Sequence, residues 1–492
     1  MTKKQSVLIA GAGIGGLATA LRLAKKGYQV EMIEKNEQAG GRLNQIKKDG
    51  FTFDTGPSFF SMSYEFHAFA KECGIELPFD IVELDPLYTV NIKGIDKPFY
   101  IHKDISKFSD QFKPYEPDFE VKMRKYLKKA GSLFDDTVDL VIKNNFDSKL
   151  KYLLTLAQVN PIHLPVLTRS FWKQVTRYFD SKEARQIISL VAFFLGRTPF
   201  DTSSIYTLLS HTEFVHDGYY NVKGGMYKIV EGLVKELEKA GVKIHYNVEI
   251  KSYEGKGKKL EALIDQNGKK WTADIIVANA DAAVFRHSVL KRKAYSQEKM
   301  DKKNWTMGYL TFYLGIDKKL ENVDHHNYYL GNNYEDYATR VMREPGLLEK
   351  PYYYVNVLSK HNDNCAPAGS ESLFFVCPVP NLIYKADWSD RDKIIDSIID
   401  DFSERIGTNI MPHIVVRESY TPKDWESRFN LYRGSGLGLA HDIKQIGALR
   451  PANFDEEFSN LYYVGASTHP GAGLPMAIIS SKLAAERVEK HV

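Results

Sequence analysis

The chain has 492 residues, of which 43% are hydrophobic and 26% are charged, enough for two or three domains with a large core. Its 66 Lys and Arg residues against 62 Asp and Glu residues leave a net charge of +4, which is too small to indicate a nucleic-acid-binding protein. The three cysteines form no C-x-x-C pair and are typical of reduced cytoplasmic thiols. No uncharged apolar run approaches the ~20 residues of a membrane span.

The strongest local signal lies in the first forty residues. A buried strand is predicted over 7–10, a glycine-rich turn follows over 11–16, and an uncharged helix start comes next. In such a unit Gly11 permits the tight turn, Gly13 lets backbone amides approach a pyrophosphate, and Gly16 lets the helix pack on the strand. The helix N-terminus adds positive potential for the phosphates. We therefore predict a dinucleotide-binding unit.

A second predicted strand, over 30–33, ends on Glu34. A carboxylate at this distance from the glycines accepts hydrogen bonds from an adenosine ribose and repels a 2′-phosphate, which favours NAD or FAD over NADP. Two alternatives compete with this interpretation. Residues 1–21 resemble a secretory signal peptide, and the unit also matches a structural βαβ turn without a ligand. The glycines and the acid that ends the strand favour the dinucleotide.

The pattern is interrupted in the next part of the chain. A glycine doublet precedes Arg42, whose guanidinium is well placed to pair with a pyrophosphate. From about 85 to 215 the alternation of strands and helices is lost. Helical stretches appear instead, such as 120–141, in which apolar residues from Val121 to Val138 are spaced for one face. The run 190–195 fits a core strand or a helix turn.

The nucleotide-binding pattern then returns twice. A helix after Gly224-Gly225 and strands over 242–248 and 273–281 predict further α/β units. Near the C-terminus, a strand over 461–466 leads into the glycine-rich loop 469–475 and a last helix. Cofactor-binding pieces at both ends and in the middle favour FAD, because FAD stretches across its domain and a distant segment holds its ring.

These segments resemble the bacterial-type carotenoid desaturases, which are phytoene-desaturase-like flavoproteins. The likeness runs in order through nearly the whole chain, and overall it favours the subgroup that acts at the 3,4 bond of 1-hydroxycarotenoids. No single residue carries that choice of subgroup. The matching segments are Gly11–Gly16, Glu34-Lys35, Gly40–Arg42, Asp49–Asp54, Gly56-Pro57, Lys223–Met226, Gly434-Ser435 and Val464–Gly473 with Pro475.

The resemblance implies an α/β fold with a discontinuous Rossmann-like FAD-binding domain of the amine-oxidase and phytoene-desaturase type. The FAD-binding domain would comprise 1–84, 216–295 and 431–492. A mixed α/β substrate domain would comprise 85–215 and 296–430, and its first part would include a helical subdomain that faces the membrane.

The resemblance also implies a set of FAD-binding positions. Glu34 would hold the ribose, Arg42 a phosphate, and the backbone of Val248 the adenine. Gly465-Ala466 would follow the pyrophosphate, and the helix start 473–476 would face the flavin pyrimidine edge, where its dipole stabilises negative charge. The complete set is Gly11, Gly13, Ile14, Gly15, Gly16, Glu34, Lys35, Gly41, Arg42, Gly56, Pro57, Ser58, Val248, Asp281, Gly465, Ala466, Gly473, Leu474 and Met476.

The implied reaction removes two hydrogens across a C–C bond of a long polyene, with FAD as hydride acceptor and an apolar tunnel that orients the substrate. Oxygen or a quinone is the expected electron acceptor, because no second nucleotide motif is visible. The sequence identifies no catalytic base. Glu213 and His211 are the first titratable groups to test, and Arg433, Ser435 and His469 are further candidates. No Ser-His-Asp order or metal-ligand spacing is present.

Three other functions share this general architecture. Carotenoid isomerases use reduced FAD without net oxidation, and amine or protoporphyrinogen oxidases act on other substrates. A related fold serves as a prenyl-binding escort protein that needs no flavin. The intact glycine and Glu34 pattern argues against the escort function.

A long polyene is practically insoluble in water, so a cytoplasmic enzyme peripherally associated with the membrane lipid surface is expected. The best candidate contact is the segment 150–179, which mixes apolar residues with cations. An ordinary amphipathic helical subdomain explains this composition equally well. The apolar residues are Leu153, Leu154, Leu156, Leu164, Val166, Leu167, Phe171, Trp172 and Phe179, and the cations are Lys149, Lys151, Arg169, Lys173 and Arg177.

Overall fold

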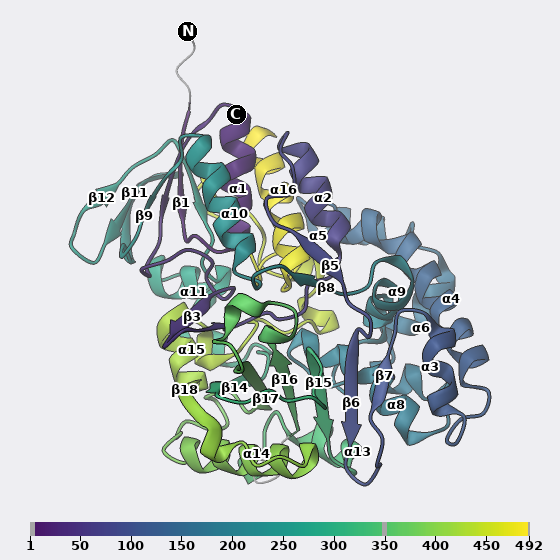
Figure 1. Ribbon diagram of the computed structural model, residues 1–492. Coiled ribbons are helices and arrows are strands. Elements are labelled where there is room, and N and C mark those ends of the chain that lie inside the picture. Colours follow the sequence, from purple (N-terminus) through teal and green to yellow (C-terminus); the bar gives the residue numbers. More distant parts are fainter. Residues whose placement is uncertain (1–4, 347–351, 491–492) are drawn as a thin grey trace.

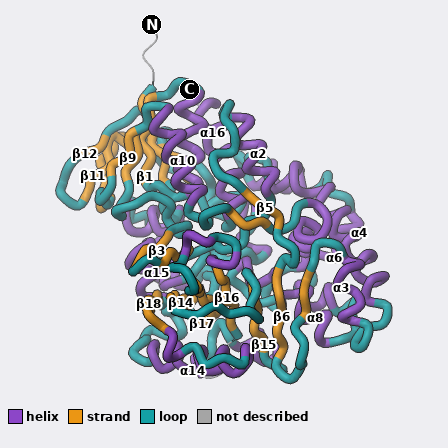
Figure 2. The backbone as a smooth tube through the Cα atoms, in the orientation of Figure 1, coloured by secondary structure: helices purple, strands orange, loops and turns teal. Residues whose placement is uncertain are grey.

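The computed structural model describes residues 5–346 and 352–490, so residues 1–4, where the signal-peptide alternative begins, lie outside the described part. Two sheets organise the molecule, and a group of helices lies to one side of them (Figure 1). The strands gather in two separate groups with loops and helices between them (Figure 2).

The first sheet is wholly parallel, with the order β19-β13-β1-β2-β9. Its strands are β1 (Ser6–Ala10), β2 (Gln29–Ile33), β9 (Lys243–His245), β13 (Ile275–Ala278) and β19 (Leu461–Tyr463). They come from three separate parts of the chain. The apolar runs of β1 and β13 follow from burial on both faces of the sheet, which is the usual situation of parallel strands.

Three helices cover one face of this sheet: α1 (Ile14–Lys25), α10 (Lys228–Lys239) and α16 (Leu474–Lys490) (Figure 1). Val7 and Ile9 point toward these helices, whereas Leu8 and Ala10 point to the opposite face. A small antiparallel sheet packs there, formed by β10 (Ile250–Lys256), β11 (Lys259–Asp265) and β12 (Lys270–Trp271).

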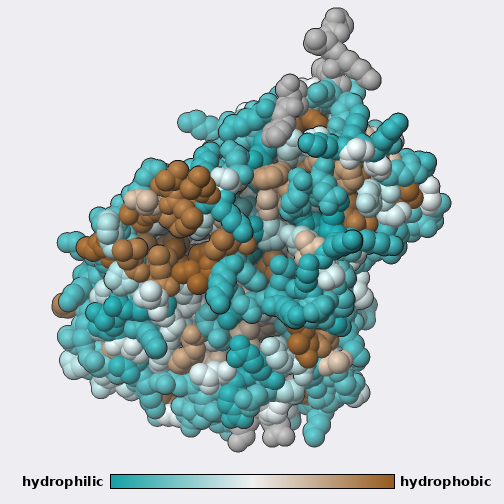
Figure 3. Space-filling model, turned by 180° about the vertical axis from the view of Figure 1, so that it is seen from behind, coloured by the Kyte–Doolittle hydropathy of each residue, from teal (hydrophilic) through white to brown (hydrophobic). Residues whose placement is uncertain are grey.

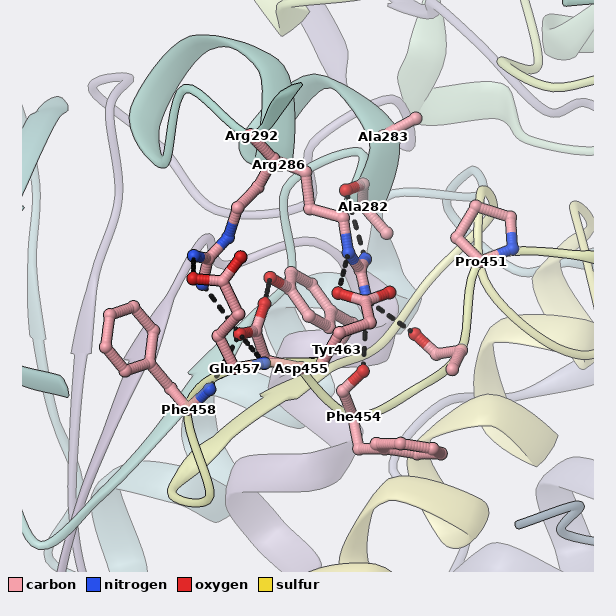
Figure 4. A network of polar contacts seen from close by, with 12 residues as sticks. Ala282, Ala283, Arg286, Arg292, Pro451, Phe454, Asp455, Glu457, Phe458 and Tyr463 are labelled. Atoms are coloured by element: carbon pink, nitrogen blue, oxygen red, sulfur yellow. Dashed lines mark hydrogen bonds and ion pairs between the residues drawn. The ribbon is translucent and has the colours of Figure 1, made fainter. Parts of the chain in front are cut away.

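A buried arginine joins the second and third parts of the parallel-sheet domain (Figure 4). Arg286, in the turn after β13, lies with its guanidinium carbon 3.7 Å from the ring centroid of Tyr463. It donates hydrogen bonds to the carbonyls of Ala282, Ala452 and Phe454 and pairs with Glu456. A second ion pair, between Arg292 and Asp455, lies beside it in Figure 4. These contacts hold β19 against β13.

The second sheet is mixed, with the order β18-β14-β17-β16-β15-β6-β7. Only β15 and β6 run parallel to each other, and the other neighbours are antiparallel. The helix α14 (Arg391–Ile406) covers one face. The strands are β6 (Tyr88–Ile92), β7 (Phe99–Ile101), β14 (Gly308–Ile316), β15 (His326–Leu330), β16 (Tyr353–Val357), β17 (Glu371–Val379) and β18 (Ile414–Tyr420).

Two short ribbons and five further helices connect the domains. The ribbons pair β3 (Gln45–Lys48) with β4 (Phe51–Asp54), and β5 (Ile81–Glu83) with β8 (Tyr220–Val222). The helices are α2 (Ser63–Glu72), α11 (Ala282–Val284), α12 (Gln297–Asp301), α13 (Tyr334–Arg340) and α15 (Pro422–Phe429).

The remaining helices form the group at the side of the mixed sheet (Figure 1). The predicted helix over 120–141 is α4, but it ends at Thr137 and continues as a π-helical turn, and Val121 is 71% exposed and not on its buried face. The run 190–195 is a 3-10 helix and not a strand. The group comprises α3 (Ile105–Phe112), α4 (Phe119–Thr137), α5 (Lys149–Leu156), α6 (Leu164–Leu167), α7 (Phe171–Val175), α8 (Lys182–Ser189) and α9 (Leu208–His211).

Candidate cofactor and substrate site

A single large cavity runs from the carboxyl ends of the parallel strands to the mixed sheet, with a volume of about 1320 Å³. This exceeds the ~300–1,000 Å³ of sites for small ligands. Ala10, Ile33, Asn279 and Gly465, which lie at the ends of four parallel strands, all line it. Ligands of open parallel sheets bind at this edge.

Every predicted FAD-binding position except Gly16 lies on the cavity lining. Gly16 is buried in α1, and a Cβ there would come within 2.3 Å of the carbonyl oxygen of Gly11. Gly16 is therefore not on the ligand-contacting surface. It permits the close approach of α1 and β1, as its place in the motif predicts. The lining positions are Gly11, Gly13, Ile14, Gly15, Glu34, Lys35, Gly41, Arg42, Gly56, Pro57, Ser58, Val248, Asp281, Gly465, Ala466, Gly473, Leu474 and Met476.

The glycine turn fits a pyrophosphate for two geometric reasons. Gly11 has a φ of +106°, which an L side chain rarely adopts. Gly13 is the N-terminal cap of α1, so the helix starts at the cavity wall, where its free amides attract anions. A Cβ on Gly13 would lie 2.8 Å from Oδ1 of Asn279. Only glycine leaves the turn open at this place.

The carboxylate of Glu34 holds the glycine turn through hydrogen bonds to backbone amides. Its Oε2 accepts a hydrogen bond of 2.7 Å from the amide of Ala12, and its Oε1 accepts one of 2.9 Å from the amide of Asn36. Burial raises the pKa of Glu34, and these hydrogen bonds counteract the rise. Because each carboxylate oxygen has about two lone pairs, the residue retains acceptor capacity toward a ribose.

Arg42 and Lys35 differ in what their cations contact. Arg42 donates to the carbonyl of Gly436 at 3.1 Å, and no carboxylate of the described residues lies within ion-pair distance of it. Burial lowers its pKa, and the charge of Asp281 opposes this change. Lys35 donates instead to the carbonyl of Ser427 and to Asn430. Arg42 is therefore the better phosphate partner.

Two other predicted contacts are engaged with the protein itself. The amide of Val248 donates to the carbonyl of Glu34 at 2.8 Å, so only its carbonyl is left for an adenine. Asp281 caps α11 by accepting hydrogen bonds from the amides of Ala283 and Val284. Asp281 thus fixes the turn after β13 as well as lining the cavity.

Asn279 and Arg450 are supporting residues that the sequence did not predict. Asn279 donates from its amide nitrogen to the carbonyl of Val464 at 3.1 Å and bridges β13 and β19. Arg450 donates to the carbonyl of Ala466 at 2.7 Å, and burial lowers its pKa to about 10. The only local signal for Asn279 was its place at the end of a predicted strand. The sequence carries no local signal for Arg450, because its hydrogen-bond partners are backbone carbonyls.

The last helix closes the cofactor half of the cavity. The N-terminus of α16 reaches the lining at Leu474 and Met476. The loop before it is held by His441, whose Nε2 accepts a hydrogen bond of 2.9 Å from the amide of Ala472. Burial lowers the pKa of His441 well below its usual value, so the ring stays neutral and accepts this bond.

The other half of the cavity has aromatic and aliphatic walls contributed by the mixed sheet and the helical group. The ring of Phe59 lies on this wall, and its centroid is 4.0 Å from that of His326 and 4.9 Å from that of Tyr219. Residues of this wall include Phe59, Phe193, Phe194, Tyr219, Tyr309, Tyr328, Tyr334, Tyr337, Tyr352, Tyr354 and Phe374. Such a surface suits a long apolar ligand.

The five titratable or polar candidates fall into two groups. Glu213, Arg433 and His469 line the cavity, and burial lowers the pKa of His469 to about 4. His211 and Ser435 are not on its lining. His211 packs against Phe134, and a Cβ on the neighbouring Gly131 would come within 2.8 Å of its ring.

The geometry fits a dinucleotide. Its pyrophosphate would lie on the amides of the glycine turn and near Arg42, and its far ring would extend toward the N-terminus of α16. Comparison with known proteins identifies the family. Residues 14–489 match the family of flavin containing amine oxidoreductases. Among solved structures, an oxidoreductase from Methanosarcina mazei has a similar fold, with a TM-score of 0.63 at 17% identity over 98% of this chain and 100% of its own.

Curated relatives are similar over nearly the full length. A phytoene desaturase from Fusarium fujikuroi is 30% identical, with 99% of this chain and 90% of the relative covered. A carotenoid 3,4-desaturase from Haloarcula japonica is 29% identical, with 99% of each covered. The chain therefore belongs to the flavin containing amine oxidoreductases, in the branch that includes phytoene desaturases, and FAD is the dinucleotide that its glycine turn serves.

Proposed function

We propose that this protein is an FAD-dependent carotenoid desaturase that introduces C=C double bonds into a long polyene, and that 3,4-desaturation of a 1-hydroxycarotenoid is its specific reaction. One observation carries the proposal: the cofactor site opens directly into a large cavity with aromatic walls. The Haloarcula japonica relative, a carotenoid 3,4-desaturase, supports the bond position.

In this reaction FAD, when bound, would supply the hydride acceptor, and the second hydrogen would leave as a proton to solvent or to a base. The protein's own residues supply orientation, because the reacting C–H bond must be held at about 3–3.5 Å from its acceptor. A hydrocarbon offers few polar handles, so the aromatic walls around Phe59 and Tyr309 must fix its position by shape and exclude water. Oxygen or a quinone is proposed as the final electron acceptor.

The test is incubation of the FAD-loaded protein with acyclic, monocyclic and hydroxylated carotenoids under air or with a quinone. We expect product absorbance to shift to longer wavelength, with stoichiometric acceptor consumption and no requirement for NAD(P). A change of cis/trans geometry without acceptor reduction would establish the isomerase alternative instead. Turnover of amines or porphyrinogens, but not of carotenoids, would refute the substrate assignment.

We further propose that the protein takes its substrate from a membrane through an apolar opening. On the face seen in Figure 3, an apolar patch surrounds a hollow. Leu153 and Leu164 are each 60% exposed and also line the cavity, as do the exposed Ile443 and Leu449. The helix α5 lies against the segment 447–449, so these side chains form one rim.

The rim differs from the predicted contact in one respect. Phe171, Trp172 and Phe179 lie in the hydrophobic core, Val166 is also buried, and none of the four is available to a bilayer. Lys149 and Lys173 are exposed, and no carboxylate of the described residues pairs with either. Apolar side chains beside such cations are typical of a surface that enters the headgroup region of anionic lipid. None of the helices in the described ranges is both long and apolar enough to cross a bilayer.

Flotation with phosphatidylglycerol vesicles tests this surface. The double variant Leu153→Ser, Leu164→Ser should lose most binding while keeping its unfolding midpoint, because both side chains are already exposed. The matched control is Val121→Ser, Val415→Ser, which removes two exposed apolar side chains elsewhere. Equal flotation of the rim variant and the wild type would contradict the proposal.

A further inference from the structure

A buried carboxyl group lies in the aromatic half of the cavity. Glu213, in the π-helical turn Thr212–His216 after α9, is 3% exposed and lines the cavity. Burial raises its pKa to about 8, and hydrogen bonding from Tyr88 and Tyr219 offsets the rise only in part. The group is therefore mainly protonated at neutral pH, so it presents a neutral acid to the cavity.

The neighbours of this carboxyl group keep the place uncharged. Burial raises the pKa of each of the phenols Tyr88, Tyr219 and Tyr328 well above the usual value, so all three stay neutral. His326, beyond Phe59, is neutral as well, because burial lowers its pKa, and it contacts the hydroxyl of Tyr354 at 2.5 Å. The site is polar without being ionic.

Two polar atoms on this wall lack a hydrogen-bond partner within the described residues: Oε1 of Glu213 and the hydroxyl of Tyr328. Both side chains are buried and both line the cavity. Buried polar atoms are nearly always hydrogen-bonded, so an unpaired pair on a cavity wall indicates that a bound molecule supplies the partner. An apolar polyene cannot do so, but an oxygen substituent can.

The place of these atoms along the cavity is defined by Phe59. This residue directly follows the lining segment 56–58, and its ring lies 6.2 Å from that of Tyr328 and 4.9 Å from that of Tyr219. The segment 56–58 is among the predicted FAD contacts. The polar wall is therefore next to the reacting end of the cavity and not at its rim.

We propose that Glu213 and Tyr328 form a polar subsite that binds an oxygen substituent, above all a hydroxyl group, of the carotenoid close to the bond that is oxidised. The inference rests on the proposed function and deepens it. A hydroxyl both donates and accepts, so it offers a partner to a carboxyl group such as that of Glu213 and to a phenol such as that of Tyr328. A hydrocarbon end group leaves both atoms unpaired, and sites built for a hydroxyl reject such analogues.

The test compares two acyclic carotenoids of equal length, one with a terminal hydroxyl and one without. Equilibrium binding is measured by quenching of tryptophan fluorescence, and turnover is measured in parallel as KM and kcat. We expect the wild type to bind the hydroxylated compound on the order of 10- to 100-fold more tightly, as the pairing of two buried polar atoms allows. The preference should appear mainly in KM.

Four variants locate that preference. Tyr328→Phe and Glu213→Leu should each remove most of it, whereas Glu213→Gln, which keeps a donor and an acceptor, should retain much of it. Tyr126→Phe is the control: its buried hydroxyl contacts Ser210 at 2.9 Å, it is not on the cavity lining, and its loss should leave the preference unchanged. Flavin absorbance and unfolding midpoints verify that each variant is folded.

Equal binding of the two carotenoids by the wild type, or an unchanged preference in both Tyr328→Phe and Glu213→Leu, would overturn the subsite. A second pair of results would also overturn the subsite: Glu213→Gln loses turnover with both substrates, and the activity of the wild type rises with pH through about 8. Glu213 would then act as a proton acceptor. If the wild type binds carotenoids with this preference but oxidises none, the proposed function fails and the subsite stands.

Discussion

The two halves of the cavity recognise their ligands by different parts of the chain. In the cofactor half the wall is built around backbone: amides of the glycine turn, and loops whose own carbonyls and amides are held by Glu34, Arg450 and His441, while the side chains of Glu34 and Arg42 add polar partners. In the substrate half the wall is made of side chains from distant parts of the chain, such as Phe59, Tyr219 and Tyr328. Backbone recognition constrains residue type strictly, whereas a side-chain wall tolerates change.

Gly16 is one of the strictly constrained positions that support the cofactor half. In Gly16→Ala the new Cβ would lie 2.3 Å from the carbonyl oxygen of Gly11, a backbone atom that cannot move without opening the turn. We expect a loss of about 3 kcal/mol in the free energy of unfolding, at the upper end for overpacking, together with loss of bound FAD. Urea denaturation and the flavin absorbance of the purified protein measure the two effects.

The matched control for this change is Gly346→Ala. Gly346 is exposed, and no atom of the described residues lies within 4 Å of the Cβ that alanine would add. This variant should keep its stability within about 0.5 kcal/mol and its full FAD content. Similar losses in both variants would mean that the close contact between α1 and β1 is not what makes Gly16 necessary.

The same contrast explains what the sequence predicts and what it does not. The glycines and Glu34 appear at fixed spacing because the turn, the helix start and the strand end are local structures. The family resemblance placed the distant pieces, and the parallel sheet indeed draws β1, β13 and β19 from three parts of the chain. No comparable local pattern exists for a wall that combines β14, β15, β16 and α9.

Local patterns also misplaced some side chains. Composition left Phe171 and Trp172 open between a membrane surface and a core; they lie in the core, while Leu153 and Leu164 remain exposed. Composition over a thirty-residue segment cannot distinguish the two faces of several short helices. That distinction depends on how α5 and α6 pack against distant segments such as 443–449.

The smallest expected effect compares two tyrosines of the mixed sheet. The hydroxyl of Tyr313 donates to the carbonyl of Thr55 at 2.9 Å, whereas the buried hydroxyl of Tyr328 has no partner in the described part of the chain. Tyr313→Phe should therefore lower the free energy of unfolding by about 1 kcal/mol, because it leaves a buried carbonyl unpaired. Tyr328→Phe should raise it by a similar amount, since an unsatisfied polar atom is removed without a change of shape. Urea denaturation of the two variants, without added carotenoid, measures both values. A lower stability of Tyr328→Phe would mean that a water molecule or a shifted side chain already forms a hydrogen bond with this hydroxyl. The polar atoms of the wall would then be hydrogen-bonded as fully as those of the loops around FAD.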